Sequence, residues 1–280
     1  MYNPPCKKYV TISISNEQEA VFLKRIQESS KGTIVLVHGA FEHAGRYEWL
    51  ADKWEEAGFN VICNDLPGQG RTDGLRGHID SFDEYIEAIS GWLNEAKIYR
   101  KPVFLFGHSM GGLAVIRMLE ETRPDLNGVI LSSPGLGFAS RPPKWVLFFT
   151  RMLEKRIPKF QVKLNLHPFM STRNTRLHDR NREDPLFLKK VSIRWYHEFE
   201  RAIAQAFQKV SQYPEIPTLV LQAGKDLIIQ AQEVQRWFKK LPIQNKKYIE
   251  WHGLFHELFN EPERDDVFQF TQSFVNKKIE

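Results

Sequence analysis

Short apolar runs rich in β-branched residues alternate along the chain with longer segments whose apolar positions recur at helical spacing. The runs that predict strands are residues 33–39, 59–65, 102–108, 127–133, 217–224 and 247–253. The first five are almost entirely apolar, as expected for strands that are covered on both faces. The segments that predict amphipathic helices are residues 49–58, 82–97 and 111–123.

Because parallel strands need helical crossovers, this alternation predicts an α/β fold with a mostly parallel, doubly wound sheet. Residues 8–15 and 20–26 predict an antiparallel pair of strands ahead of that sheet. The alternation stops in residues 135–213, which are basic, aromatic and helix-like, without a convincing strand. We therefore predict a core built from residues 1–134 and 214–280, with residues 135–213 inserted above the sheet as a helical cap.

A glycine-rich turn joins the predicted strand 102–108 to the predicted helix 111–123. Its sequence G-H-S-M-G, residues 107–111, has the G-x-S-x-G pattern of a nucleophile elbow, where side chains at both glycines would collide with the adjoining strand and helix. The hydroxyl of Ser109 would project above the sheet beside a helix N-terminus, which favours developing negative charge. A chance match is the alternative, but the flanking strand and helix favour a catalytic serine.

A serine hydroxyl is a weak nucleophile unless a base takes its proton and an acid orients that base. On this type of fold the acid and the base follow the serine in that order, each after a later strand. Asp226 directly follows the predicted strand 217–224 and is the predicted acid. Asp65 also ends a strand, but it precedes the serine and is expected to fix the turn that follows it.

Nine histidines compete for the role of the base. His256 lies a few residues after the last predicted strand, in a loop that enters a final helix, and is the predicted base. His252 stands at the strand end itself, where the backbone would hold its ring too low. His38 and His108 belong to the turns of two motifs and are expected to hydrogen-bond the local backbone.

Ester or amide hydrolysis also needs two backbone N–H groups that stabilise the negative oxygen of the tetrahedral intermediate. We predict that Met110, directly after the nucleophile, supplies one and that Ala40, after the strand 33–39, supplies the other. No metal site is indicated, because His256-Glu257 lacks the second histidine of H-E-x-x-H. No nucleotide or flavin motif accompanies these residues, so no cofactor is predicted.

Several stretches together resemble the monoacylglycerol lipase and lysophospholipase branch of the α/β-hydrolase superfamily. They are VHGAFEHAGRY (37–47), NDLPGQG (64–70), GHSMGG (107–112), QAGKD (222–226) and LFHELFNE (254–261). Within that branch the chain is most similar to bacterial phospholipases of the kind that release lysophospholipids.

The resemblance implies a serine hydrolase that cleaves carboxylic esters of lipids through an acyl-enzyme. The implied substrate is a lysophospholipid or phospholipid first and a monoacylglycerol second. The family's triad falls on Ser109, Asp226 and His256, and its oxyanion donors fall on Ala40 and Met110. A general carboxylesterase, an aminopeptidase and a non-catalytic lipid-binding protein remain alternatives.

Two residues depart from the family pattern. Phe41 occupies a place where monoacylglycerol lipases often have glycine, so it is expected to reshape the acyl channel beside the oxyanion hole. Gln69 stands where many relatives carry histidine, and it is expected to affect only its own turn.

The net charge of +5 is unevenly distributed along the chain. Between Arg141 and Arg182 there are eleven basic and only two acidic side chains, so this part of the predicted cap carries +9 and the rest of the chain −4. The basic residues are concentrated in the inserted segment and no recognition motif accompanies them, so a nucleic-acid partner is not predicted. The oligomeric state is left open.

A helix within residues 142–160 would place five apolar side chains on one face: Trp145, Phe148, Phe149, Met152 and Leu153. This stripe either packs onto the core or forms an interfacial helix that docks on anionic lipid, with basic residues near the phosphates. Both alternatives leave room for an apolar tunnel under the cap. The residues predicted to line the substrate pocket or the cap are Phe41, Trp145, Phe148 and Phe149.

Hydrophobic residues make up 42% of the chain and charged residues 26%, which is ordinary for a soluble globular protein. The two cysteines, Cys6 and Cys63, are expected to be free thiols in a reducing compartment. The N-terminus lacks the apolar segment of a secretory signal, and no apolar run approaches the roughly 18 residues of a membrane-spanning helix. The prediction is a cytoplasmic protein with peripheral membrane contact.

Overall fold

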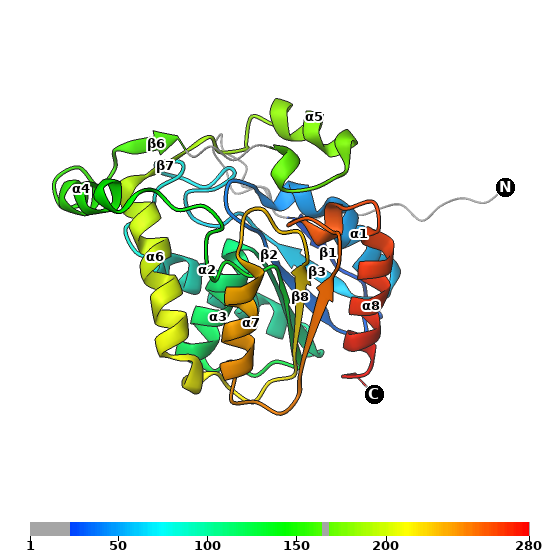
Figure 1. Ribbon diagram of the computed structural model, residues 1–280. Coiled ribbons are helices and arrows are strands. Elements are labelled where there is room, and N and C mark those ends of the chain that lie inside the picture. The colour runs from blue at the N-terminus through cyan, green and yellow to red at the C-terminus, as the bar shows by residue number, and fades with distance from the viewer. Residues whose placement is uncertain (1–22, 164–167, 280) are drawn as a thin grey trace.

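The computed structural model describes residues 23–163 and 168–279, and a central sheet runs through the middle of the molecule (Figure 1). Its strands lie in the order β1-β3-β2-β4-β5-β8-β9. All neighbouring strands are parallel except β1 and β3, which are antiparallel. The strands are β1 (Leu23–Arg25), β2 (Thr33–Val37), β3 (Asn60–Cys63), β4 (Val103–His108), β5 (Gly128–Ser132), β8 (Thr218–Ala223) and β9 (Lys246–Trp251).

The six strands predicted for the sheet are all present, and the predicted α/β class is confirmed. β2, β3, β4, β5 and β8 are buried along their whole length, as their apolar sequences indicate, whereas β9 lies half-exposed at the edge. Part of the predicted strand 20–26 forms β1, while residues 8–15 lie outside the described residues.

Helices cover both faces of this sheet (Figure 1). One face carries α2 (Asp83–Lys97), α3 (Met110–Thr122), α7 (Ala231–Lys240) and, packed against α3, α6 (Ile193–Gln208); the other carries α1 (Glu48–Glu56) and α8 (Arg264–Asn276). Each face encloses its own buried apolar cluster. The three predicted helices lie within two residues of their predicted ends. α7 was not predicted, although its two buried residues, Val234 and Trp237, lie at helical spacing.

The chain between β5 and β8 forms α4 (Lys144–Glu154), β6 (Gln161–Lys163), α5 (Thr175–Glu183), β7 (Lys190–Ser192) and α6. β6 and β7 pair antiparallel, so the expectation that this segment holds no strand is wrong. Each strand has only three residues and a largely polar sequence, and therefore neither produces an apolar run. The short 3-10 helices are η1 (Ala44–Tyr47), η2 (Pro168–Met170), η3 (Val210–Gln212) and η4 (Leu258–Asn260).

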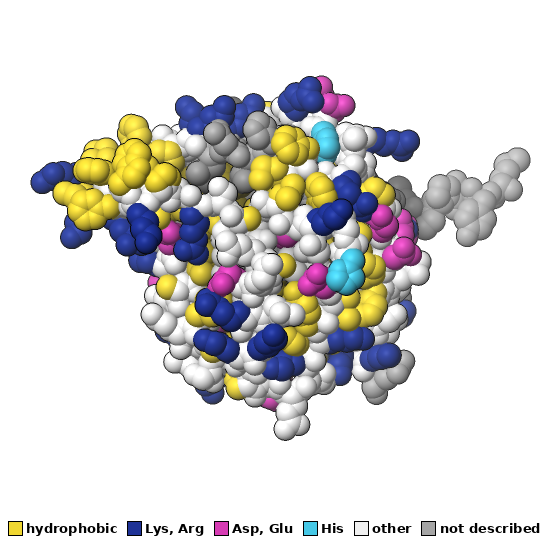
Figure 2. All heavy atoms as spheres, in the orientation of Figure 1, with side chains coloured by type: hydrophobic (Ala, Val, Ile, Leu, Met, Phe, Trp, Pro, Cys, Tyr) yellow, Lys and Arg dark blue, Asp and Glu magenta, His cyan; other side chains and the backbone are white. Residues whose placement is uncertain are grey.

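Helix α4 projects from the body of the molecule and turns its apolar stripe to solvent, where Figure 2 shows a hydrophobic patch edged by basic side chains. Trp145 is 66% exposed and Phe148 is 62% exposed. The opposite side of α4 packs on α6, where His197 Nε2 lies 3.0 Å from Thr150 Oγ1. The alternative in which the stripe packs onto the core is therefore wrong. Within the described part of the chain, no helix is both long and apolar enough to cross a membrane.

Candidate active site

Ser109 lies at the sharp turn between β4 and α3. Its backbone has φ 51° and ψ −119°, a strained conformation for a residue with a side chain. Glycine is needed on both sides, since a Cβ at Gly107 would lie 2.8 Å from the Gly111 oxygen and one at Gly111 would lie 2.3 Å from the His38 oxygen. The Ser109 N–H donates to the Ser132 oxygen at 3.0 Å, which holds the turn against β5. This is the geometry of a nucleophile elbow.

Asp226 and His256 follow β8 and β9 and form a hydrogen-bonded pair. The His256 Nδ1–H donates to Asp226 Oδ2 at 2.8 Å, and the backbone N–H groups of Ile228 and Ile229 donate to Oδ1 at 2.9 and 2.8 Å. Burial raises the pKa of Asp226, but the His256 ring and these hydrogen bonds lower it below its ordinary value overall. Burial lowers the pKa of His256, but the Asp226 carboxylate, together with the charges of Glu257 and Glu42, raises it overall.

The competing residues have other partners or point away. Asp65 accepts backbone N–H groups of two neighbouring turns at 2.7 and 2.9 Å, which confirms its predicted role in fixing a turn. His38 Nδ1 hydrogen-bonds the adjacent Gly39 carbonyl at 2.8 Å, as predicted. His108 Nδ1 instead bonds the carbonyl of Ser132 on the neighbouring strand β5 at 3.1 Å, so the expectation of a local partner is wrong for His108. The side chain of His252 is 89% exposed. Of these histidines, His256 is the one that pairs with Asp226.

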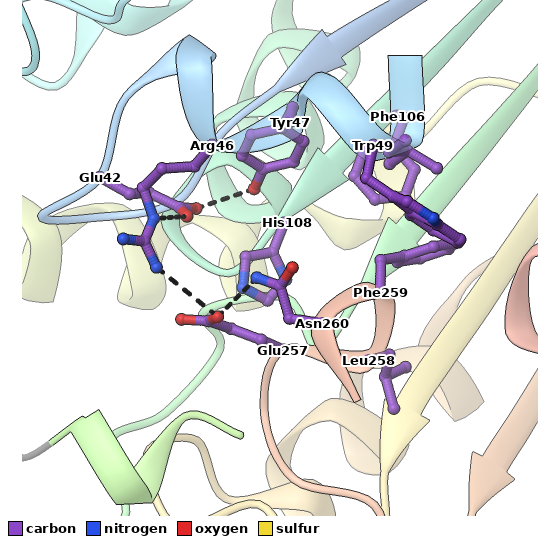
Figure 3. A pocket seen from close by; sticks show the side chains of 11 residues that line it. Glu42, Arg46, Tyr47, Trp49, Phe106, His108, Glu257, Leu258, Phe259 and Asn260 are labelled. Carbon is purple, nitrogen blue, oxygen red and sulfur yellow. Dashed lines mark hydrogen bonds and ion pairs between the residues drawn. The ribbon is translucent and has the colours of Figure 1, made fainter. Parts of the chain in front are cut away.

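A group of buried charges is centred on Arg46 (Figure 3). Glu42 Oε1 accepts the Gly39 N–H at 2.5 Å and the Tyr47 hydroxyl at 2.8 Å. The Arg46 guanidinium lies 3.4 Å from Glu42 and 3.8 Å from Glu257, the residue after the candidate base. Burial raises the pKa of Glu42, but the neighbouring imidazole and guanidinium groups lower it to about 2. Nothing in the sequence pattern singles out Glu42 except its place in the 37–47 motif.

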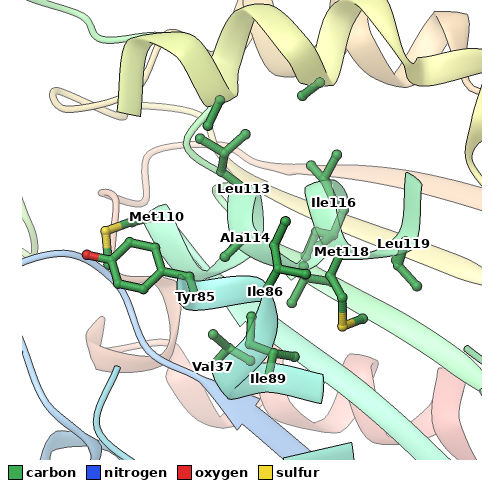
Figure 4. Close-up of a cluster of buried hydrophobic side chains, with 14 of the residues drawn as sticks. Val37, Tyr85, Ile86, Ile89, Met110, Leu113, Ala114, Ile116, Met118 and Leu119 are labelled. Atoms are coloured by element: carbon green, nitrogen blue, oxygen red, sulfur yellow. The ribbon is translucent and has the colours of Figure 1, made fainter. Parts of the chain in front are cut away.

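The two predicted oxyanion donors lie on either side of the elbow. Ala40 lines the cavity that contains Ser109, and Met110 begins α3. Among the described residues, no acceptor is bonded to either backbone N–H, so both are available to a ligand. The Met110 side chain lies beside Tyr85 in the buried cluster between α2 and α3 (Figure 4), and this packing fixes the start of α3.

Phe41 adopts a left-handed backbone conformation with φ 71°, and the buried Gln69 holds it there. Gln69 Oε1 accepts the Phe41 N–H at 3.0 Å, so the expectation that Gln69 affects only its own turn is wrong. The Phe41 ring contacts Phe187 and Trp195, with ring centroids 6.4 and 5.6 Å apart, and forms part of the cavity wall. Both departures from the family pattern therefore act on the loop that carries Ala40.

A cavity of about 430 Å³ opens beside Ser109 and His256. Its apolar wall includes Phe41, Phe138, Phe187, Trp195, Phe199 and Ile229. Trp145, Phe148 and Phe149 do not belong to the wall as the structure describes it, because α4 turns them to solvent. Of the four residues predicted for the pocket or the cap, Phe41 therefore lines the cavity, while the three α4 residues lie in the inserted segment outside it. Aromatic side chains of α6, which carry no distinctive motif, take their place.

A family model described as serine aminopeptidase, S33 (Hydrolase_4) matches residues 28–263, which is most of the chain. The chain belongs to this family. Phospholipase YtpA of Bacillus subtilis (strain 168) is 42% identical to it over 247 residues, covering 88% of this chain and 95% of that protein. The monoglyceride lipase of Homo sapiens is 27% identical over 256 residues, covering 89% and 83%.

Among solved structures, the Paleococcus ferrophilus monoacylglycerol lipase matches with a TM-score of 0.84. It is 30% identical, and the match covers 93% of this chain and 99% of that one. The resemblance to the monoacylglycerol lipase and lysophospholipase branch of the α/β-hydrolases is therefore confirmed. This chain is a serine hydrolase of the α/β-hydrolase type.

Proposed function

We propose that this S33 hydrolase cleaves carboxylic esters of lipids, a lysophospholipid or phospholipid first and a monoacylglycerol second. The observation that carries the proposal is that His256, paired with Asp226, lines the same largely apolar cavity as Ser109. A nucleophile, a base and an orienting acid suit acyl transfer, and an apolar wall suits an acyl chain. The names of the relatives, phospholipase and monoacylglycerol lipase, support the same substrate class.

In the proposed reaction the Ser109 oxygen attacks the ester carbonyl while His256 Nε2 takes the hydroxyl proton. Asp226 stabilises the imidazolium that forms, in keeping with the raised pKa of His256. The N–H groups of Ala40 and Met110 stabilise the oxyanion. His256 then gives its proton to the leaving alcohol, and the acyl-enzyme remains. Water attacks the acyl group by the same route and releases the fatty acid.

Product analysis by mass spectrometry tests this proposal, with a lipid extract incubated with the wild-type enzyme or with Ser109→Ala. We expect the variant to lose at least about 10³-fold of ester hydrolysis with an unchanged melting temperature. Ser273→Ala, which removes an exposed hydroxyl on α8, is the matched control and should behave as wild type. Turnover by Ser109→Ala at the wild-type rate would exclude the proposal.

Two further assays separate the rival functions. A fluorophosphonate probe should label the wild type at Ser109, whereas absence of labelling would favour a non-catalytic lipid-binding protein. A series of nitrophenyl esters beside an aminoacyl amide distinguishes a lipase from a general carboxylesterase and an aminopeptidase. We expect medium or long acyl chains to be preferred, and a preference for the amide would contradict the proposal.

We also propose that α4 docks on an anionic bilayer. The support is the exposure of its whole apolar stripe, with Phe149, Met152 and Leu153 at 56%, 57% and 42% in addition to Trp145 and Phe148. Exposed basic residues surround that stripe, including Lys144, Lys155 and Arg156. An apolar face edged by basic side chains suits the boundary between acyl chains and phosphates.

The proposal includes the division of the chain into a cap, residues 135–213, and a core, residues 1–134 and 214–280. It is supported by Met170 and Trp195, which reach the cavity from the inserted segment. It also includes a cytoplasmic location, supported by the free, buried thiol of Cys63. Cell fractionation tests the location.

A further inference from the structure

Part of the wall of the cavity beside Ser109 is polar and comes from the inserted segment. Ser140, Arg141, Pro142 and Pro143 line it, just before α4 begins. Among the described wall residues, Arg141 is the one that carries a lysine or arginine charge. The acidic wall residues, Glu42 and Glu257, both pair with the buried guanidinium of Arg46.

Arg141 is exposed, and no carboxylate of a described residue lies within ion-pair distance of it. The nearby acid is Glu200, whose pKa is raised by burial but lowered overall by His197, Arg151 and Arg141. Glu200 lies 3.5 Å from Arg151 and 3.4 Å from His197, so its charge is already balanced by closer partners. The guanidinium of Arg141 is therefore available to a ligand in the cavity.

A second polar group lies near Arg141. Tyr196 is only 8% exposed and lines the same cavity, and its buried hydroxyl has no hydrogen-bond partner among the described residues. Burial raises the pKa of Tyr196 to about 12, while the charges of Arg141 and Arg151 act in the opposite direction. A buried hydroxyl without a partner is costly unless a ligand satisfies it. The ring itself is held by stacking on Phe138 at 5.7 Å.

We propose that Arg141 and the Tyr196 hydroxyl bind the headgroup phosphate of a lysophospholipid whose acyl ester is seated at Ser109. This inference rests on the proposed esterase function and names the substrate that its site selects. A guanidinium donates two parallel hydrogen bonds to phosphate oxygens, and a tyrosine hydroxyl can donate a third. A monoacylglycerol offers only hydroxyl groups at this position and leaves the charge of Arg141 unpaired.

The test compares 1-oleoyl lysophosphatidylglycerol with 1-oleoylglycerol, which share the acyl chain and differ in the phosphate. We expect the ratio of their kcat/KM values to fall about tenfold in Arg141→Gln, the usual effect of losing a charge-assisted hydrogen bond. Arg141→Lys should recover part of the ratio. Tyr196→Phe, which removes only the hydroxyl, should lower the ratio severalfold. Arg176→Gln removes an equal charge from an exposed position on α5, outside the cavity and on a different helix from the α4 stripe, and should leave the ratio unchanged.

Three other outcomes would overturn the inference, and each points to a different explanation. Equal losses on both substrates in Arg141→Gln would mean that Arg141 only shapes the cavity, and the proposed esterase function would stand. The same loss in Arg176→Gln would assign the preference to the overall charge of the cap. A wild type that cleaves neither lipid would overturn the inference and the proposed function together.

Inorganic phosphate distinguishes a headgroup subsite from a site for the free ion. A headgroup subsite binds phosphate only when the acyl chain of the same lipid is bound. Millimolar phosphate, added at constant ionic strength, should then leave the KM for lysophosphatidylglycerol unchanged. A rise of that KM in the wild type that disappears in Arg141→Gln would show a free-ion site, and would overturn the headgroup assignment.

Discussion

Gly39 donates its backbone N–H to Glu42 across 2.5 Å, so a buried carboxylate closes the loop that leads to Ala40. Glu42 is in turn held by the Tyr47 hydroxyl and the Arg46 guanidinium. The Gly39 amide is therefore committed within the loop, and the next residue, Ala40, lies on the cavity wall. A negative charge two residues from the proposed oxyanion donor thus fixes the backbone rather than taking part in the reaction.

We expect Glu42→Gln to lower kcat about tenfold with little change in KM, because an oxyanion loop acts on the transition state rather than on the bound substrate. The same change should lower the free energy of unfolding by about 1–3 kcal/mol, since a charged hydrogen-bond acceptor is lost beside the buried Arg46. Steady-state kinetics and urea unfolding measure both effects. Glu56→Gln is the control, because that carboxylate is exposed and pairs only with the surface residue Lys53 among the described residues. A loss confined to KM would contradict this role for Glu42.

The core elements could be predicted from the sequence because each has a strong periodic signal. The five central strands are continuous apolar runs. Such short runs are typical of strands that are buried on both faces of a sheet, and all five are. β6 and β7 escaped prediction because each has only three, largely polar residues. α7 was missed although its apolar residues Val234, Trp237 and Phe238 recur at helical spacing. The exposure of the apolar face of α4 could not be predicted either, since its amphipathic pattern is the same whether that face meets the core or the solvent.

The candidate triad could be placed from chain order and strand ends, which local sequence reveals. The residues around the triad could not be predicted from the sequence, because their positions depend on contacts between distant segments. Gln69 and Phe41 are 28 residues apart and meet through one hydrogen bond. Arg46 and Glu257 come from opposite ends of the chain. The cavity wall follows from how α6 packs on α3, and an aromatic residue on a helix gives no sign of facing a cavity.

The elbow glycines make a prediction about stability. In Gly111→Ala the new methyl group would lie 2.3 Å from the His38 oxygen and 2.5 Å from the Val37 oxygen, both backbone atoms that cannot move aside. We expect a loss of several kcal/mol in the free energy of unfolding, as for other overpacked sites, or failure to fold. Gly91→Ala is the matched control, because a methyl group added there would point into open space and the residue lies inside α2. That variant should be stabilised by about 0.5–1 kcal/mol, and equal melting temperatures for the two variants would refute the argument.

The pKa of His256 predicts the acidic limb of the pH profile. Burial lowers this pKa, but Asp226 raises it above 6.5 overall, and the ring must be neutral to accept the serine proton. We therefore expect kcat/KM to rise with pH through a midpoint above 6.5. Asp226→Asn removes the raising charge while burial remains, so the midpoint should move to lower pH. The rate on the plateau should fall by about 10⁴. An unchanged midpoint in that variant would show that Asp226 does not raise the pKa of the group that sets the pH profile.

The exposed stripe of α4 predicts how the enzyme meets a bilayer. We expect the double variant Trp145→Ser/Phe148→Ser to sediment with phosphatidylglycerol vesicles at least about tenfold more weakly, because each buried aromatic side chain contributes about 1.5–3 kcal/mol. High salt should weaken binding of the wild type further, since the surrounding basic residues act through charge. Ile98→Ser, at a position 73% exposed beyond the end of α2, is the matched control and should bind as wild type. Equal binding by the double variant and the control would show that α4 does not enter the membrane.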